Sequence, residues 1–211
     1  DEEGQDHTEH RQYLITNGIT SAEIFDKVPI KSESSSNLIK ITKKVLPSST
    51  ELQSLQQLPG NYRITPNFTI DMLSERAAVT KDIIKAGDLT YGHIAYNLQC
   101  LALNCLEPIY ALYPNLLITS AYRDPARSIN TSQHPKGQAA DLQFRGSHYD
   151  DYFDIAVKLA QAVCFDQFIL EYTSYSRNPW IHISFSKDVN RGQVMTFYNN
   201  KKYADGIHRL G

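Results

Sequence analysis

The stretch TSQHPKGQAADLQF, residues 131–144, places a histidine and an aspartate seven positions apart with small residues between them. Its last six residues, AADLQF (139–144), predict a short strand. A period of two puts Asp141 and Gln143 on one face of this strand and apolar side chains on the other. The spacing fits either a pair of metal ligands or an ordinary turn that leads into a strand. A metal site therefore requires further ligands from elsewhere in the chain.

A second stretch, WIHISF (180–185), carries a complementary pattern. The same period of two puts Trp180 and His182 on one face and isoleucine side chains on the other. If the two strands are neighbours, Asp141 and His182 converge on one side of the sheet, and His134 reaches them from the preceding turn. Two histidines and one carboxylate, with a fourth position open to water, form a catalytic zinc site. A structural site normally closes that position, often with cysteine.

The hydrophobic pattern from residue 67 onward predicts one α+β domain. Helical spacing runs through residues 66–83, 92–113 and 150–165, and Pro108 predicts a kink in the second of these helices. Strand patterns occupy residues 115–123, 139–144, 166–172, 180–185 and 192–199, followed by a hairpin-like turn at 200–203. Loops rather than helices separate several strands, which favours a mostly antiparallel sheet with flanking helices over a doubly wound sheet.

Residues 1–66 have a different character. KSESSSN (31–37) is polar and rich in serine, LIKITKKV (38–45) alternates like a strand, and the region lacks the apolar periodicity for a core of its own. We therefore predict an extended N-terminal arm or docking segment over residues 1–66, followed by one folded domain over residues 67–211.

Composition excludes two classes of partner. The net charge of -2, from 21 basic and 23 acidic side chains, supplies no bulk field that would attract nucleic acid or an anionic membrane. No apolar run approaches the roughly 18 residues that a membrane span needs. The three cysteines, Cys100, Cys105 and Cys164, lie in apolar stretches and are expected to be buried free thiols.

The histidines also belong to ordered motifs, S-x-H-x-x-G-x-A-x-D and W-x-H. The matching residues are Ser132, His134, Gly137, Ala139 and Asp141 for the first motif and Trp180 and His182 for the second. These motifs resemble the signatures of the zinc D-alanyl-D-alanine carboxypeptidases and related peptidoglycan endopeptidases. ITSAYR resembles the S-G-Y-R segment of that family, with Ala121 in place of the usual glycine.

Two further stretches, DQFILEY and the WIHISF segment with NRGQVMT downstream, resemble the phage branch of this family, which includes endolysins and virion-associated murein hydrolases. The resemblance covers residues 67–211 and leaves the arm unexplained. It implies a hedgehog/DD-peptidase-like fold for a zinc peptidase domain over residues 67–211. It also implies one Zn²⁺ ion held by His134, Asp141 and His182.

The resemblance implies further roles around the metal. Arg123 matches an arginine that contacts substrate, which fits a planar cation able to pair with a carboxylate or polarise a carbonyl. A structural ion pair is the alternative for Arg123. Ser132 and Tyr122 are candidate hydrogen-bond donors to substrate, and Trp180 borders the site either as a packing residue or as a substrate platform.

The general base is the least direct assignment. Many members of the family carry an acid three residues before the last histidine, and that position here is Pro179, which cannot titrate. The phage branch instead carries a glutamate in the preceding strand, matched by Glu171. Glu171 would take a proton from the attacking water and deliver one to the leaving amine. Asp166 is the second candidate.

These expectations describe a zinc metallopeptidase that cleaves a D-amino-acid-containing bond in the stem peptide of peptidoglycan. The phage-like motifs and the arm favour a virion-associated murein hydrolase, made in the host cytoplasm and docked to a tail or baseplate through residues 1–66. A free endolysin and a bacterial DD-carboxypeptidase are alternatives. A structural tail protein that keeps the fold without the activity is another, because of Pro179.

Overall fold

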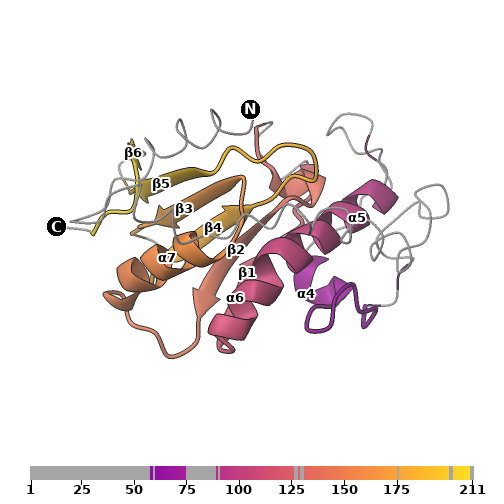
Figure 1. The fold of residues 1–211 in the computed structure, drawn as a ribbon, viewed down its shortest axis with the longest axis horizontal. Coiled ribbons are helices and arrows are strands. Elements are labelled where there is room, and N and C mark those ends of the chain that lie inside the picture. Colours follow the sequence, from indigo (N-terminus) through magenta and orange to yellow (C-terminus); the bar gives the residue numbers. More distant parts are fainter. Residues whose placement is uncertain are drawn as a thin grey trace, which may run out of the picture.

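The computed structural model describes residues 58, 60–74, 89, 91–125, 128, 131–174, 176–199 and 202–209. In these residues the chain is an α+β domain with one six-stranded sheet (Figure 1). The helices are α4 (Ile70–Ser74), α5 (Tyr91–Leu101), the π-helical η2 (Ala102–Leu106), α6 (Glu107–Leu112), the 3-10 helix η4 (His134–Lys136) and α7 (Asp151–Ala162). The strands are β1 (Leu116–Ser120), β2 (Ala139–Phe144), β3 (Gln167–Glu171), β4 (Trp180–Ser184), β5 (Gln193–Tyr198) and β6 (Lys202–Asp205).

The strand order in the sheet is β1-β2-β4-β3-β5-β6. Every neighbouring pair is antiparallel except β3 and β5, which run parallel. The predicted mostly antiparallel α+β architecture is therefore confirmed, and each of the five predicted strands is present. The turn predicted at residues 200–203 is wrong for Lys202 and Tyr203, which begin β6 and pair with β5. β6 is an exposed edge strand, so its sequence lacks the apolar alternation that marks a buried strand.

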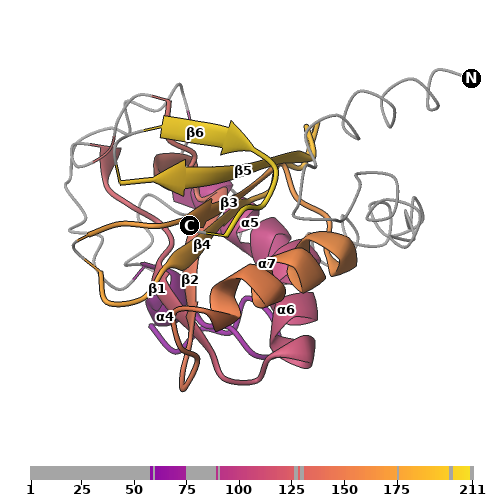
Figure 2. The same ribbon diagram turned by 90° about the vertical axis from the view of Figure 1, so that its left-hand side faces the viewer.

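The two faces of the sheet have different environments. Figure 2 shows α5, α6 and α7 together on one side of the sheet. The side chains that face these helices are fully buried, as in Leu142, Leu170, Ile181 and Ile183. Each of these side chains contributes about 1.5–3 kcal/mol to folding by leaving water. The opposite face carries the alternate residues of the same strands, and an open cavity lies over it.

The long helical segment before β1 is interrupted where the sequence predicts a kink. Regular α5 gives way to the π-helical η2 at Ala102, and α6 begins at Glu107 with Pro108 in its first turn. Proline has no backbone N–H and its ring clashes with the carbonyl four residues earlier, so a regular α-helix cannot continue through it. A widened turn removes that clash, and the predicted irregularity takes this form.

The folded part of the chain begins before residue 67. Ile64 is 2% exposed and shares the core with Phe68, while a bridge joins Arg63 to Thr69. The Gln99 side chain donates a hydrogen bond to the Ile64 carbonyl at 2.7 Å. Residues 60–66 therefore belong to the domain rather than to the predicted arm. The remainder of the arm, apart from Leu58, and most of the helix predicted over residues 66–83 lie outside the described residues.

The cysteine prediction holds for two of three residues. Cys100 and Cys105 are buried free thiols, whereas Cys164 is exposed. Helix α7 ends at Ala162, so Cys164 falls on the connection to β3 rather than on the buried face of the helix. Among the described helices, none is long and apolar enough to cross a membrane.

Gly137 closes the turn between η4 and β2 and cannot be replaced without strain. Its φ is +69°, and a Cβ at this position would lie 2.6 Å from the carbonyl oxygen of Ile94 in α5. We predict that Gly137→Ala lowers the free energy of unfolding by about 3 kcal/mol, because left-handed strain and a backbone clash add together. Urea unfolding with an unchanged m value measures this loss.

Gly146 provides the matched control for this substitution. Its φ of +81° imposes the same left-handed conformation, but no atom lies within 4 Å of a Cβ built there. Gly146→Ala should therefore cost only about 1 kcal/mol. Equal losses for the two variants would contradict the close approach of Gly137 to α5.

Candidate metal centre

The pairing of β2 with β4 brings two predicted ligands together. Asp141 lies directly opposite His182 in the antiparallel register, so both side chains are on the same face of the sheet. His134 begins the 3-10 helix η4, five residues before β2. The convergence predicted from the alternation of the two strands is therefore confirmed.

The three side chains place their ligand atoms at the spacing of a metal site. Asp141 Oδ1 lies 3.0 Å from His182 Nδ1 and 3.3 Å from His134 Nε2, and the two histidine nitrogens are 3.3 Å apart. Bonds of 2.0–2.1 Å in a tetrahedral zinc site put neighbouring ligand atoms about 3.3–3.4 Å apart. These side chains therefore form a possible metal-binding group, and its donor set and spacing fit a zinc ion.

The ring of His134 is oriented by a backbone hydrogen bond. Its Nδ1 lies 2.6 Å from the carbonyl oxygen of Ala121, and the residue is 3% exposed. A carbonyl can only accept, so Nδ1 donates the proton of this bond, and Nε2 is the nitrogen that faces Asp141 and His182. A histidine whose second nitrogen donates in this way is held in the tautomer that a metal requires.

Asp141 lies between the histidines and a cation. Its Oδ1 faces His134 and His182, and its Oδ2 accepts a hydrogen bond from Arg123 Nη2 at 2.8 Å. Burial by itself would raise the pKa of Asp141, but hydrogen bonds and charge from the two histidines hold the pKa well below its usual range. The carboxylate is therefore ionised, as a metal ligand must be.

Glu171 faces the same cavity from the neighbouring strand. It pairs with Trp180 in the antiparallel register of β3 and β4, next to the position of Pro179. Burial raises the pKa of Glu171 to about 7, although His182, a hydrogen bond from Trp180 and the charge of Arg123 act to lower it. A carboxylate with a pKa near neutrality suits proton transfer. Its role as the base stays a prediction.

Asp166, the second candidate for the base, lies in a different environment. It is 3% exposed, and its carboxylate accepts hydrogen bonds from Arg191 Nε and Nη2 at 2.9 and 2.6 Å. Burial would raise the pKa of Asp166, but the bonds and charge of Arg191 outweigh it and hold the pKa low. Asp166 is not among the residues that line the cavity. This geometry disfavours Asp166 as a base.

The predicted substrate contacts are divided between cavity and core. Ser132, Trp180 and Arg123 line the cavity. Arg123 forms the ion pair that was its structural alternative, with Asp141, and its side chain is 37% exposed at the cavity, so its contact with substrate stays a prediction. Tyr122 lies in the hydrophobic core, 6% exposed, where its backbone N–H donates to the Leu73 carbonyl. The structure therefore places Tyr122 away from the cavity that substrate would enter.

The cavity has a volume of about 900 Å³ and extends well beyond the predicted residues. Ten of its lining residues were not among the predicted site residues: Thr119, Ser128, Thr131, Gln133, Gln167, Ile169, Arg191, Gln193, Met195 and Tyr203. Alternation along β3 could have identified Gln167 and Ile169, because they share the face of Glu171. The residues from loops and from β6 carry no such periodic signal.

Comparison with protein-family models and with curated proteins found no match for this chain.

We predict that the metal-free protein binds one Zn²⁺ ion and that Asp141→Ala weakens this binding at least about 100-fold, because one of three ligands is lost. Titration calorimetry gives the stoichiometry and affinity. Wild-type protein should also gain about 2.7 kcal/mol of stability at a zinc concentration 100 times Kd.

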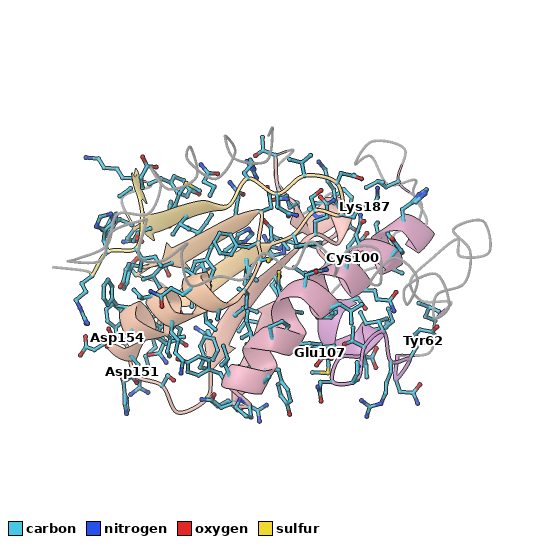
Figure 3. The ribbon with its side chains drawn as sticks, viewed as in Figure 1. Tyr62, Cys100, Glu107, Asp151, Asp154 and Lys187 are labelled. Atoms are coloured by element: carbon cyan, nitrogen blue, oxygen red, sulfur yellow. The ribbon has the colours of Figure 1, made fainter. Side chains whose placement is uncertain are left out.

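Asp154→Ala is the matched control for the loss of a carboxylate. Asp154 lies on α7, on the helical side of the sheet, with a side chain that is 72% exposed (Figure 3). Its replacement should leave zinc affinity unchanged. An Asp141→Ala protein that binds zinc as tightly as the wild type would contradict the proposed ligand set.

Proposed function

We propose that this chain is a zinc-dependent peptidoglycan peptidase with a hedgehog/DD-peptidase-like fold. The observation that carries the proposal is the spacing of His134, Asp141 and His182, whose ligand atoms all lie within 4.8 Å of one another at the wall of an open cavity. These three residues belong to the two motifs that resemble the zinc D-alanyl-D-alanine carboxypeptidases. A D-amino-acid-containing peptide bond is the corresponding substrate.

The residues around the site can divide the chemistry of hydrolysis. A bound zinc ion would polarise the scissile carbonyl and lower the pKa of a water molecule. Glu171 would accept a proton from the attacking water and deliver a proton to the leaving amine nitrogen. Arg123 uses Nη2 to hold Asp141 Oδ2 and Ser120 Oγ, and its remaining donors would orient a substrate carbonyl or carboxylate.

Pro179 raised the alternative of an inactive structural tail protein. Glu171 can replace the acid that the family usually carries at the position of Pro179. It lies opposite Trp180, the residue that follows Pro179, and it faces the cavity. This geometry supports an active enzyme over a structural protein that retains only the fold.

The biological setting is part of the same proposal. The phage-like motifs support a murein hydrolase that is carried in the virion and opens the host cell wall during infection. The predicted N-terminal arm, of which residues 1–57 lie outside the described residues, would connect it to a tail or baseplate. A free endolysin or a bacterial DD-carboxypeptidase would share the same catalytic site.

The central test is hydrolysis of purified murein. We predict that the zinc-loaded wild type releases peptides and that Glu171→Gln reduces the rate about 10²- to 10⁴-fold, because the amide cannot accept the proton. Mass spectrometry of the released fragments measures the rate and identifies the bond. Zinc affinity should stay close to the wild-type value.

Glu107→Gln is the control for this change of charge. Glu107 begins α6 (Figure 3), accepts hydrogen bonds from Asn67, and is not among the residues that line the cavity. Its amide variant should cleave murein at the wild-type rate. Zinc-loaded wild type that releases no fragments would contradict the proposed function, and full activity of Glu171→Gln would contradict the base assignment.

The pH dependence of kcat/KM supplies a second test of Glu171. A base must be deprotonated, so the rate should fall about tenfold per pH unit below the pKa of that base. Burial raises the pKa of Glu171 to about 7 in the metal-free protein, and the charge of a bound zinc ion acts to lower it. The acidic limb should therefore lie near or somewhat below pH 7.

Zinc content is measured at each pH so that loss of the metal is not mistaken for protonation of the base. The residual activity of Glu171→Gln should lack this acidic limb. The same limb in that variant would assign the titration to another group.

A further inference from the structure

A network of hydrogen bonds outside the metal ligands joins three segments at one end of the cavity. At its centre is Asp166, whose side chain is 4% exposed just before β3. Arg191, in the loop before β5, donates to this carboxylate through its backbone N–H, Nε and Nη2 at 2.6–2.9 Å. Gln133 completes the set with a hydrogen bond from Nε2 to Asp166 Oδ2 at 2.9 Å. Each carboxylate oxygen is therefore satisfied.

Gln133 connects this network directly to a metal ligand. It is the residue before His134, and its backbone carbonyl accepts hydrogen bonds from the N–H groups of Lys136 and Gln138, both at 3.1 Å. The carbonyl thereby forms the turn that carries His134, while the side chain ties that turn to Asp166. One residue both shapes the ligand turn and anchors it to the sheet.

The opposite side of the same turn is anchored separately. Asn97 in α5 donates to the Lys136 carbonyl at 2.8 Å, and Gly137 packs closely against the backbone of Ile94. These contacts hold the turn against the helix but do not reach β3 or β5. A backbone bond from Phe185 N–H to the Gln138 carbonyl at 2.8 Å ties the turn to the end of β4, and the bond between Gln133 and Asp166 ties it to the segment just before β3.

Position matters here because a metal site tolerates little displacement. Ligands must be held within about 0.5 Å of their productive geometry, and partners behind the ligands supply that precision. The hydrogen bond from His134 Nδ1 to Ala121 orients the ring, but it does not fasten the turn to β3, the strand that ends at Glu171. Gln133 and Asp166 provide that second constraint.

We infer that Gln133 and Asp166 are positioning residues for the metal, and that the bond between them raises zinc affinity by holding His134 in place. This inference rests on the zinc site of the proposed function. It gives Asp166 a role different from that of a general base. The competing interpretation is that Asp166 and Arg191 form only a fold-stabilising ion pair, in which case Gln133 contributes nothing to metal binding.

Gln133→Met separates these interpretations. Methionine has similar length and no amide, so the bond to Asp166 and the longer one from Arg191 Nη2 at 3.5 Å are lost, while the pair of Asp166 with Arg191 remains. We predict that the full 211-residue chain carrying this substitution binds Zn²⁺ about tenfold more weakly, the usual cost of losing a partner behind a ligand. Competition with a chromogenic chelator measures the affinity. The melting temperature of the metal-free variant should stay within about 4 °C of the wild type.

Gln167→Met is the matched control. Gln167 lines the same cavity, and its side chain donates to Gln193 at 2.6 Å rather than to the ligand turn. Its zinc affinity should remain within about twofold of the wild type. A Gln133→Met affinity within about twofold of the wild type, or equal weakening of both variants, would overturn the inference.

Zinc affinity tests this inference and murein cleavage tests the proposed function, so the two can fail separately. Wild-type protein that binds zinc but cleaves no murein would contradict the proposed function alone, since the affinity comparison would still decide the role of Gln133. Wild-type protein that binds no zinc would overturn both.

Discussion

The candidate site depends on one interaction, the antiparallel pairing of β2 with β4. This register sets Asp141 opposite His182 and leaves their side chains on the face of the sheet that the helices do not cover. A shift of one residue would turn every side chain of a strand to the other face. The apolar alternates of these strands, such as Leu142 and Ile181, resist that shift because they are fully buried. Core packing thus specifies the geometry of the proposed ligands.

Charge at the site is arranged by burial and by partners outside the ligand set. Asp141 is ionised because the two histidines favour its anion, and Arg123 binds the oxygen that faces away from them. Glu171 lies on the next strand, where burial favours its protonated form. One face of the sheet therefore holds two carboxylates with opposite pKa shifts, a combination that suits one of them to ligation and the other to proton transfer. Pro179, which precedes the residue opposite Glu171, has no ionisable group.

Much of the fold could be predicted from the sequence because its buried strands alternate and its helices carry regular apolar spacing. β6 was not predicted because an exposed edge strand has no buried face and therefore no alternation of apolar and polar residues. Tyr122 was predicted to be a hydrogen-bond donor to substrate, yet it lies in the core, where its backbone N–H donates to Leu73 of α4. The sequence left Asp166 as the second candidate for the base, and the structure disfavours it because its carboxylate is paired with Arg191. Its ion pair with Arg191 joins residues 25 positions apart, and no local pattern indicates such a contact.

The sequence by itself determined the identity of the proposed ligands, the face on which two of them lie, and the general α+β architecture. Period-two alternation and ordered motifs are local properties, so they can be read without coordinates. Only the tertiary structure decided which strands are neighbours, which carboxylate is ion-paired, and which residues anchor the turn of His134. These features depend on contacts between segments that are distant along the chain, and the packing of the whole domain determines those contacts.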